Sequence, residues 1–277
     1  MMKPSETVFA PAKLNLFLHV TGRRDDGLHT LQSLFVFLNI GDRLDFFEAA
    51  EDDLRMSPDL GVPREKNLAW KALEGVRNRF PELPKRQIHI EKTLPAEAGI
   101  GGGTADAAAV VHWAESLAPN VEFRSALANL GADMPPAMDQ TARLWTGTGD
   151  EPGMAVSGLS GTPVLLLKPS TGVSTGACFA ALQGQFSPSF DFDPAGDLKR
   201  QLRRARNDLE APARSLNLDI EEALSALEAL EGAWLVRMTG SGSTCFALFN
   251  EKGPRDAALD AVRQSHPTWW SMSAEII

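Results

Sequence analysis

The sequence predicts an α+β protein of two domains, and three patterns support that prediction. Apolar and polar residues alternate through the first 50 positions, as they do in β-strands. A strand near residue 90 runs into a helix through a glycine-rich segment. From residue 163 onward, strands and helices follow one another in a βαββαβ-like order, which is typical of a split βαβ domain. Residues 147–161 are rich in glycine and turn residues and are predicted to link the two domains, which then cover 1–153 and 154–277.

The first predicted strand, over residues 8–20, carries polar side chains in its middle. Leu14, Leu16 and Leu18 share one face, whereas Lys13 and Asn15 project from the other. A lysine is seldom buried without a partner, so this second face either is open to solvent or borders a site. The pattern alone leaves both alternatives open.

The elements that follow are a polar connector, strands and a helix. Residues 21–33 predict the connector, 34–40 a buried strand and 44–47 its neighbour. Asn67 is placed to cap a helix whose apolar positions extend to Phe80.

The stretch from Ile88 to Leu117 is the one around which the chain is organised. A strand enters a segment with four glycines, and a helix begins at Gly103 or Thr104. The first N–H groups of a helix lack intrahelical partners and lie at its positive end, so a phosphate can bind there. The alternative is a tight structural connection. A Walker loop is excluded because no lysine follows Gly103, and the third glycine of a dinucleotide fingerprint is missing.

The rest of the chain continues the alternation of helices and strands. A helix over 123–130 ends at Gly131. Asp133 follows it and is either a solvated turn residue or a residue that takes part in chemistry. The second half predicts strands, a helix capped by Ser174 or Thr175, and a small-residue turn over 239–243. That turn is either a simple hairpin or a place where a ligand approaches the main chain.

Composition excludes several classes of protein. The net charge of −9 argues against a nucleic-acid partner, and no apolar run approaches the length of a membrane span. The five histidines show no metal-ligand spacing, and Cys178 and Cys245 are expected to be buried thiols. The N-terminus shows no secretory segment, so we expect a cytoplasmic protein.

Four separated stretches resemble the motifs of the GHMP kinase superfamily. They read PAKLNLFLHVTGRRDDGLHTLQS, LPAEAGIGGGTADAAA, GADMP and TGSGSTCFALF, with NDLE at 207–210 as a further match. The segment from Asp26 to Ser33, with Lys13, Asn15 and GVST at 172–175, is similar to the members that act on a cytidine diphosphate-linked polyol in the non-mevalonate isoprenoid pathway.

The resemblance implies a two-domain GHMP kinase fold, with a mixed N-terminal domain and a ferredoxin-like C-terminal domain that bind ATP and substrate in the cleft between them. It implies that Asp133 takes the proton of the substrate hydroxyl at C2 and that Lys13 assists it. Mg²⁺ is expected, with the Thr104 hydroxyl as its protein contact. The residues implied in binding the ATP phosphates are Pro95, Ala96, Glu97, Ala98, Gly99, Ile100, Gly101, Gly102, Gly103, Thr104 and Ala105.

The resemblance also assigns substrate contacts to Asn15, Leu28, His29, Thr175 and Phe179. Leu28 departs from the tyrosine that the family usually has there, and the chain has no tyrosine at all, so one stacking surface for cytosine is lost. A second departure places a carboxylate at residue 97, where it disfavours phosphate unless it points outward.

Two other functions remain open at this stage. One is a superfamily kinase for mevalonate, homoserine or a sugar, and the other is a sensor that binds nucleotide without turnover. We expect a small-molecule substrate, a monomer or weak homodimer, and no nucleic-acid or membrane partner.

Overall fold

The computed structural model describes residues 3–277 and divides them into two compact units. The first unit consists of the chain up to Lys13, Ile40–Ala96 and Gly101–Gln140. The second unit consists of Leu14–Asn39, Glu97–Ile100 and Thr141–Ile277. These units do not coincide with a division of the chain after residue 153, because Leu14–Asn39 belongs to the second unit. The domain limits 1–153 and 154–277 stay a prediction.

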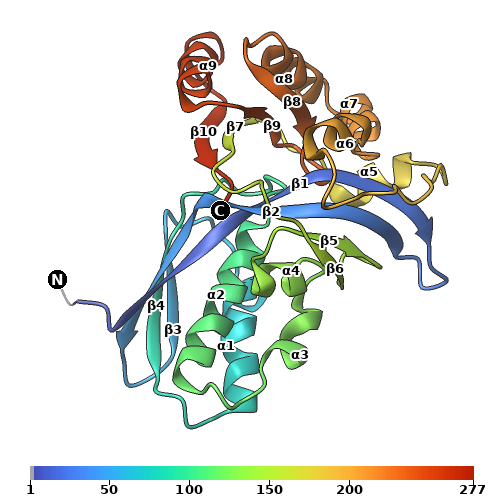
Figure 1. Ribbon diagram of the computed structural model, residues 1–277. Helices are drawn as coiled ribbons and strands as arrows, with labels where there is room; N and C mark the ends of the chain where they lie inside the picture. Colours follow the sequence, from blue (N-terminus) through green and yellow to red (C-terminus); the bar gives the residue numbers. More distant parts are fainter. Residues whose placement is uncertain (1–2) are drawn as a thin grey trace. The chain divides into compact units, whose positions relative to one another are not determined.

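Two long strands contribute residues to both units, and the larger sheet is built on them (Figure 1). The strand order is β3-β4-β2-β5-β6, with β1 paired to β2. Within the first unit, β2 pairs antiparallel with β4, and β3 pairs parallel with β4. The strands are β1 (Glu6–Arg23), β2 (His29–Glu48), β3 (Asp53–Ser57), β4 (Arg86–Glu91), β5 (Arg143–Thr146) and β6 (Glu151–Ala155).

Three sequence expectations about these strands are wrong. Residues 34–40 and 44–47 belong to one continuous strand, β2. The connector predicted over 21–33 shrinks to a short turn, where Gly27 has a φ of 88° that few other residues adopt. The segment 147–161 is not a plain link, because it contains β6, which pairs antiparallel with β5 after a turn at Gly147 and Gly149.

The four helices of the first unit share one hydrophobic core with its strands, and α1 and α4 pack on α2. The side chain of Asn67 caps the first of them by accepting from the N–H groups of Ala69 and Trp70, as the sequence predicted. Trp113 is fully buried and stacks on Phe46 of β2, with ring centroids 4.9 Å apart. The helices are α1 (Leu68–Arg79), α2 (Gly102–Leu117), α3 (Arg124–Leu127) and α4 (Met134–Asp139), and α3 continues as the 3₁₀ turn Ala128–Leu130.

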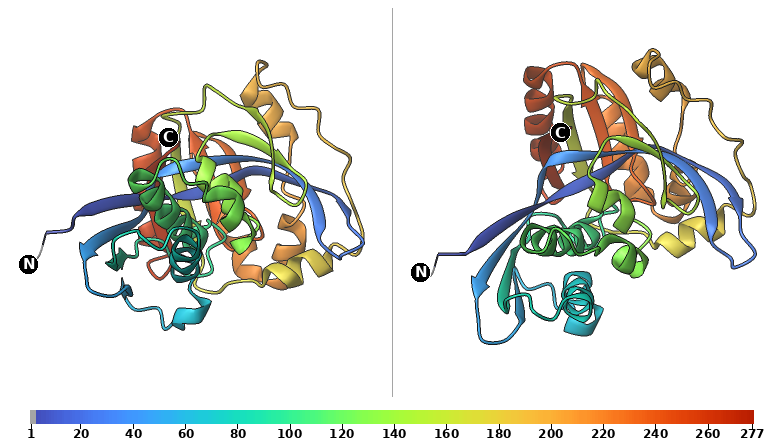
Figure 2. Two further views of the ribbon diagram at one scale, coloured as in Figure 1. Left: turned by 90° about the horizontal axis from the view of Figure 1, so that it is seen from below. Right: turned by 60° about the horizontal axis from the view of Figure 1, so that its bottom comes forward.

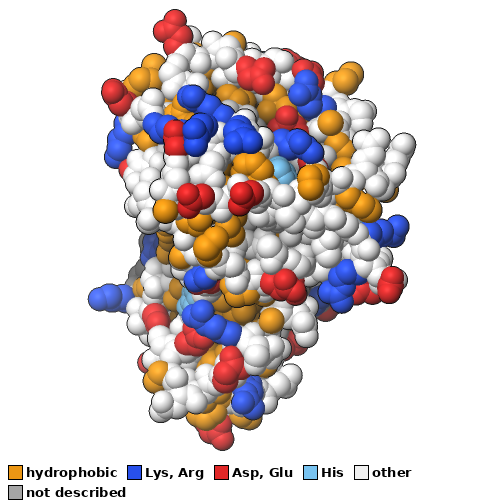
Figure 3. All heavy atoms as spheres, turned by 45° about the vertical axis from the view of Figure 1, so that its right-hand side comes forward, with side chains coloured by type: hydrophobic (Ala, Val, Ile, Leu, Met, Phe, Trp, Pro, Cys, Tyr) orange, Lys and Arg blue, Asp and Glu red, His pale blue; other side chains and the backbone are white. Residues whose placement is uncertain are grey.

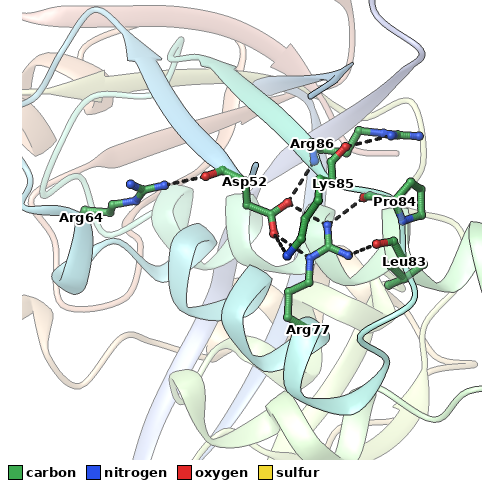
Figure 4. Close-up of polar contacts among 7 residues, drawn as sticks. All are labelled: Asp52, Arg64, Arg77, Leu83, Pro84, Lys85 and Arg86. Atoms are coloured by element: carbon green, nitrogen blue, oxygen red, sulfur yellow. Dashed lines mark hydrogen bonds and ion pairs between the residues drawn. The ribbon is translucent and has the colours of Figure 1, made fainter. Parts of the chain in front are cut away.

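A polar cluster anchors α1 to the strands of the same unit (Figure 4). The Asp52 carboxylate accepts hydrogen bonds from the Arg77 guanidinium at 2.8 Å, from Lys85 Nζ at 3.1 Å and from the Arg86 N–H at 3.0 Å. The Asp52 carbonyl accepts from Arg64. Because Arg77 lies on α1 and Arg86 begins β4, this one carboxylate joins both elements.

The second unit contains a four-stranded antiparallel sheet in the order β10-β7-β9-β8. This is the split βαβ arrangement that the βαββαβ order predicted. Figures 1 and 2 show α8 and α9 packed against this sheet. Both cysteines are buried and free, as expected. The elements are β7 (Pro163–Lys168), α5 (Thr175–Ala181), α6 (Leu198–Arg204), α7 (Glu210–Leu216), α8 (Leu218–Glu228), β8 (Ala233–Met238), β9 (Cys245–Phe249), α9 (Lys252–Ser265) and β10 (Trp270–Glu275).

Basic and acidic side chains are interspersed over the face drawn in Figure 3. No helix among residues 3–277 is long and apolar enough to cross a membrane.

Candidate active site

The glycine-rich segment ends at the start of α2. Two of its glycines adopt the left-handed backbone conformation just before the helix begins. Gly99 and Gly101 have φ values of 71° and 75°, and Gly101 is the N-cap residue. The helix therefore begins at Gly102, slightly before the predicted Gly103 or Thr104. Within the described chain no side chain caps this helix, and its first turn holds no acidic residue. Its N–H groups and positive dipole end thus suit an anion.

Asp133 precedes α4 but does not cap it with its carboxylate. Instead, its Oδ2 accepts from Lys13 Nζ at 3.0 Å. The lysine side chain is 8% exposed and the aspartate side chain 36%, so the carboxylate retains access to a ligand. Of the two alternatives that the strand pattern left for Lys13, exposure to solvent is excluded, because this side chain is buried with a charged partner.

The first unit brings this pair close to the start of α2. A Cβ added to Gly101 would lie 3.5 Å from Cβ of Lys13, so the main chain of the loop passes beside the lysine stem. A Cβ added to Gly131 would lie 3.8 Å from the Thr104 hydroxyl. The first turn of α2 therefore lies next to the segment that leads into Asp133.

The remaining part of the loop, Glu97–Ile100, belongs to the second unit and lies against the turn between β8 and β9. The Ala98 carbonyl accepts from the Thr244 N–H at 3.3 Å. A Cβ on Gly99 would fall 2.3 Å from the carbonyl oxygen of Gly242, so only glycine fits there. The small residues of the 239–243 turn thus admit the main chain of the loop. The Glu97 side chain is exposed and its Oε2 lies near Gly172, which is compatible with the outward orientation that phosphate binding requires.

The predicted cytidine contacts His29 and Phe179 meet in the second unit. Their rings stack with centroids 4.7 Å apart and an interplanar angle of 20°. Burial, and secondarily the positive charge of Arg23, lower the pKa of His29, so its ring is neutral near pH 7 and offers one donor and one acceptor. Leu28 beside it is 55% exposed.

Other predicted substrate residues make contacts of their own in the second unit. Asn15 donates from Nδ2 to the Ser33 hydroxyl at 2.8 Å, and the Thr175 and Ser241 hydroxyls are 2.8 Å apart. Phe186, which the sequence reasoning missed, approaches His29 edge-on at 6.1 Å. Its only signal in the sequence is an aromatic residue inside an otherwise irregular segment.

A buried charged cluster beside the loop was also missed. Lys92 Nζ lies 2.5 Å from Asp42 Oδ2 and 2.6 Å from Asp106 Oδ2. Burial, opposed by Lys92 and reinforced by the Asp42 charge, raises the pKa of Asp106 to about 7. Burial disfavours the lysine charge, but the two carboxylates outweigh it and raise the pKa of Lys92. Two features of the sequence could have indicated this cluster. Lys92 shares a strand face with Ile88 and Ile90, and Asp106 interrupts an apolar helix.

A glycine loop that opens a helix with uncapped amides, and a buried lysine paired with a partly exposed carboxylate, are the kinds of group that phosphoryl transfer uses for charge stabilisation and proton transfer. On an α+β scaffold they are the groups expected of a small-molecule kinase. Residues 67–147 match the family described as GHMP kinases N terminal domain, and residues 186–268 match GHMP kinases C terminal. The chain belongs to the GHMP kinases, which use ATP as co-substrate.

Relatives with the same printed name extend over nearly the whole chain. A 4-diphosphocytidyl-2-C-methyl-D-erythritol kinase of Novosphingobium aromaticivorans is 39% identical and aligns with 99% of this chain and 93% of its own length. That of Methylobacterium radiotolerans is 40% identical, with 94% and 95% covered. A crystal structure of 4-(cytidine 5'-diphospho)-2C-methyl-D-erythritol kinase superposes with a TM-score of 0.83 at 29% identity, covering 98% of this chain and 99% of the other.

Proposed function

We propose that the enzyme transfers the γ-phosphate of ATP to the 2-hydroxyl of 4-diphosphocytidyl-2-C-methyl-D-erythritol in non-mevalonate isoprenoid biosynthesis. The observation that carries the chemistry is the 3.0 Å pair of Lys13 and Asp133, with the carboxylate partly exposed and the lysine buried. The full-length relatives with this printed activity support the choice of substrate.

In this proposal Asp133 accepts the proton of the attacking hydroxyl through its partly exposed carboxylate. Lys13 holds that carboxylate in place and adds positive charge beside the transferring phosphoryl group. Residues Pro95–Ala105 surround the ATP phosphates, and the free main-chain N–H groups at the start of α2 donate to them. Phosphoryl transfer depends mainly on such alignment and charge stabilisation, so this division of roles fits the chemistry.

The residues at the start of α2 fit a magnesium ion shared with the nucleotide. No group of three or more His, Cys, Asp or Glu side chains suited to a metal occurs in the described part of the chain. Mg²⁺ commonly takes one or two protein oxygens and completes its shell with phosphates and water, and the half-buried Thr104 hydroxyl can provide one oxygen. When bound, the ion neutralises phosphate charge.

We predict that Asp133→Asn lowers kcat by about 10²–10⁴-fold, because the amide cannot take up the proton. The affinity for ATP should remain within about twofold of wild type, since the amide still has an oxygen that accepts from Lys13. The measurement is ADP release with Mg-ATP and 4-diphosphocytidyl-2-C-methyl-D-erythritol, run beside mevalonate, homoserine and galactose. Asp139→Asn, at the other end of α4, is the matched control and should keep wild-type turnover.

The four acceptors separate the remaining functions. Turnover confined to the cytidine compound supports the proposal, whereas turnover with another alcohol alone keeps the mechanism but replaces the substrate. ATP binding without turnover on any acceptor would point to a nucleotide sensor. Full activity of Asp133→Asn would exclude this carboxylate as the base.

We also predict that Phe179→Ala raises KM for the cytidine substrate by about 5- to 150-fold, because a base stacked on an aromatic ring gains roughly 1–3 kcal/mol. KM for ATP should not change. Competition by cytidine diphosphate reports on the base site without the polyol, and it should weaken in parallel. Phe186→Ala should have a smaller effect, because Phe186 meets His29 only edge-on. An unchanged cytidine diphosphate affinity in Phe179→Ala would remove this ring from the base site.

Asn15, Leu28, His29 and Thr175 complete the proposed substrate contacts. The Leu28 side chain offers apolar contact in place of aromatic stacking, and the neutral His29 ring can hydrogen-bond the base edge. A cytoplasmic location, a monomer or weak homodimer, and the absence of nucleic-acid and membrane partners stay predictions.

A further inference from the structure

Three charged side chains of the first unit form a buried cluster between β2, the end of β4 and α2. Their side chains are 0% exposed for Asp42, 6% for Asp106 and 7% for Lys92. The lysine bridges the two carboxylates at 2.5 and 2.6 Å. Burying three charges is expensive unless their contacts are well formed, so a role beyond packing has to be considered.

Asp42 contacts one end of the glycine loop and lies close to the other. Its Oδ1 accepts from the N–H of Thr93 at 2.7 Å and from the N–H of Leu94 at 3.0 Å, directly before the loop begins at Pro95. Its Oδ2 lies 3.5 Å from the position that a Cβ of Gly102 would occupy, at the first residue of α2. One fully buried carboxylate therefore holds the place where the chain leaves β4 and lies next to the place where it enters α2.

Lys92 extends this connection into the helix. Its Nζ joins Asp42, on β2, to Asp106, in the second turn of α2. Charge-assisted hydrogen bonds are directional, so the pair fixes the rotation of the helix about its own axis as well as its distance from β2. The first N–H groups of α2 point along the helix axis, and their lateral position depends on that rotation.

The Asp52 cluster is a useful contrast because it too holds an aspartate with a main-chain N–H and a basic side chain. Asp52 also accepts from a main-chain N–H and from basic side chains, and its side chain is 10% exposed. However, the partners of its carboxylate are Arg77 of α1, Lys85 just before β4 and Arg86 at the start of β4, and none of them lies in residues 93–106. A general stabilising role would make the two aspartates equivalent, whereas a role in the loop would distinguish them.

We propose that Asp42, linked through Lys92 to Asp106, is a positioning residue for the phosphate-binding loop: it fixes both ends of residues 95–101 so that the amides at the start of α2 meet the nucleotide phosphates. This proposal rests on the nucleotide-binding role of that loop in the proposed function. Asp42 itself touches main chain and Lys92, so it acts through the loop.

The test compares Asp42→Asn with the matched control Asp52→Asn. For Asp42→Asn we expect about tenfold weaker binding of Mg-ADP by calorimetry, a similar rise in KM for ATP, and unchanged KM for the acceptor alcohol. Hydrogen exchange should accelerate at Thr93, Leu94 and the first turn of α2. The Asp52→Asn variant should lose thermal stability while keeping wild-type ADP affinity and loop exchange.

Equal ADP affinity in Asp42→Asn and wild type, or an equal loss in both variants, overturns the proposal. If Asp42→Asn does not fold, Asp106→Asn decides, because it replaces one charged partner of Lys92 by a neutral amide and leaves the Asp42 contacts intact. It should weaken ADP binding by about threefold, and wild-type affinity in this variant also overturns the proposal. A wild-type protein that binds no ADP refutes the nucleotide role and this inference together, whereas ADP binding without turnover refutes the proposed reaction alone.

Discussion

The first unit has two carboxylate clusters, around Asp52 and around Lys92. Basic side chains outnumber carboxylates in the first, and carboxylates outnumber basic side chains in the second. Asp52 is one carboxylate served by Arg77, Lys85 and a main-chain N–H, whereas Lys92 is one cation shared by Asp42 and Asp106. The pKa values of Asp52 and Asp106 shift in opposite directions, as this difference in charge predicts. Burial raises the pKa of Asp52, but hydrogen bonds from Arg77, Arg86 and Lys85 outweigh it and bring the pKa below its usual value, while the pKa of Asp106 rises to about 7.

The difference indicates that the clusters serve different needs. In the Asp52 cluster, several donors bind one carboxylate, so its charge is fully hydrogen-bonded. The same carboxylate joins α1 to β4, which is what a stabilising contact requires. The Lys92 cluster leaves Asp106 Oδ1 buried without a hydrogen-bond partner among the described residues. Such a cluster is an inefficient source of stability, and its place at the two ends of the glycine loop gives it another use.

The largest expected difference between the clusters comes from removing one cation from each. Lys92→Met leaves two buried carboxylates without their shared cation, so we predict a loss of about 3–5 kcal/mol in the free energy of unfolding. Arg77→Met should cost less, because Asp52 keeps Lys85 and the Arg86 N–H. Urea unfolding at pH 7, followed by circular dichroism, measures both.

A second substitution sharpens this prediction. Adding Asp106→Asn to Lys92→Met removes one of the two unpaired charges and should restore about half of the lost stability. If Lys92→Met and Arg77→Met cost the same, or if the added substitution restores nothing, then charge imbalance does not distinguish the clusters.

Much of the fold could be predicted from local patterns. Asn67 before an apolar repeat predicted the start of α1, and the βαββαβ order predicted the antiparallel sheet of the second unit. The errors came from strand lengths. A polar residue inside a strand looks like a connector, so β2 was divided, and glycines near residue 150 concealed β6.

The candidate site could be predicted in part because its motifs are local. The glycines, Lys13 and Asp133 stand out in the chain, but only the family resemblance, and neither spacing nor periodicity, predicts that Lys13 and Asp133 meet across 120 residues. Asp42, Lys92 and Asp106 escaped notice because each is unremarkable alone. A buried ionic network depends on three elements meeting, and neither spacing nor composition encodes that meeting.

The smallest predicted effect concerns acid. Because the pKa of Asp52 is lower in the folded protein than the ordinary aspartate value of 3.8, its contribution to stability is complete above that value and is lost as the pH falls through the folded value. We therefore expect Asp52→Asn to cost about 1–2 kcal/mol in unfolding free energy between pH 5 and 7, and progressively less below pH 4. Urea unfolding from pH 3 to 7 measures this, with the exposed Asp59→Asn as control. A cost for Asp52→Asn that stays constant down to pH 3 would mean that the basic side chains around Asp52 do not stabilise its charged form, and the contrast with the Lys92 cluster would then reduce to geometry.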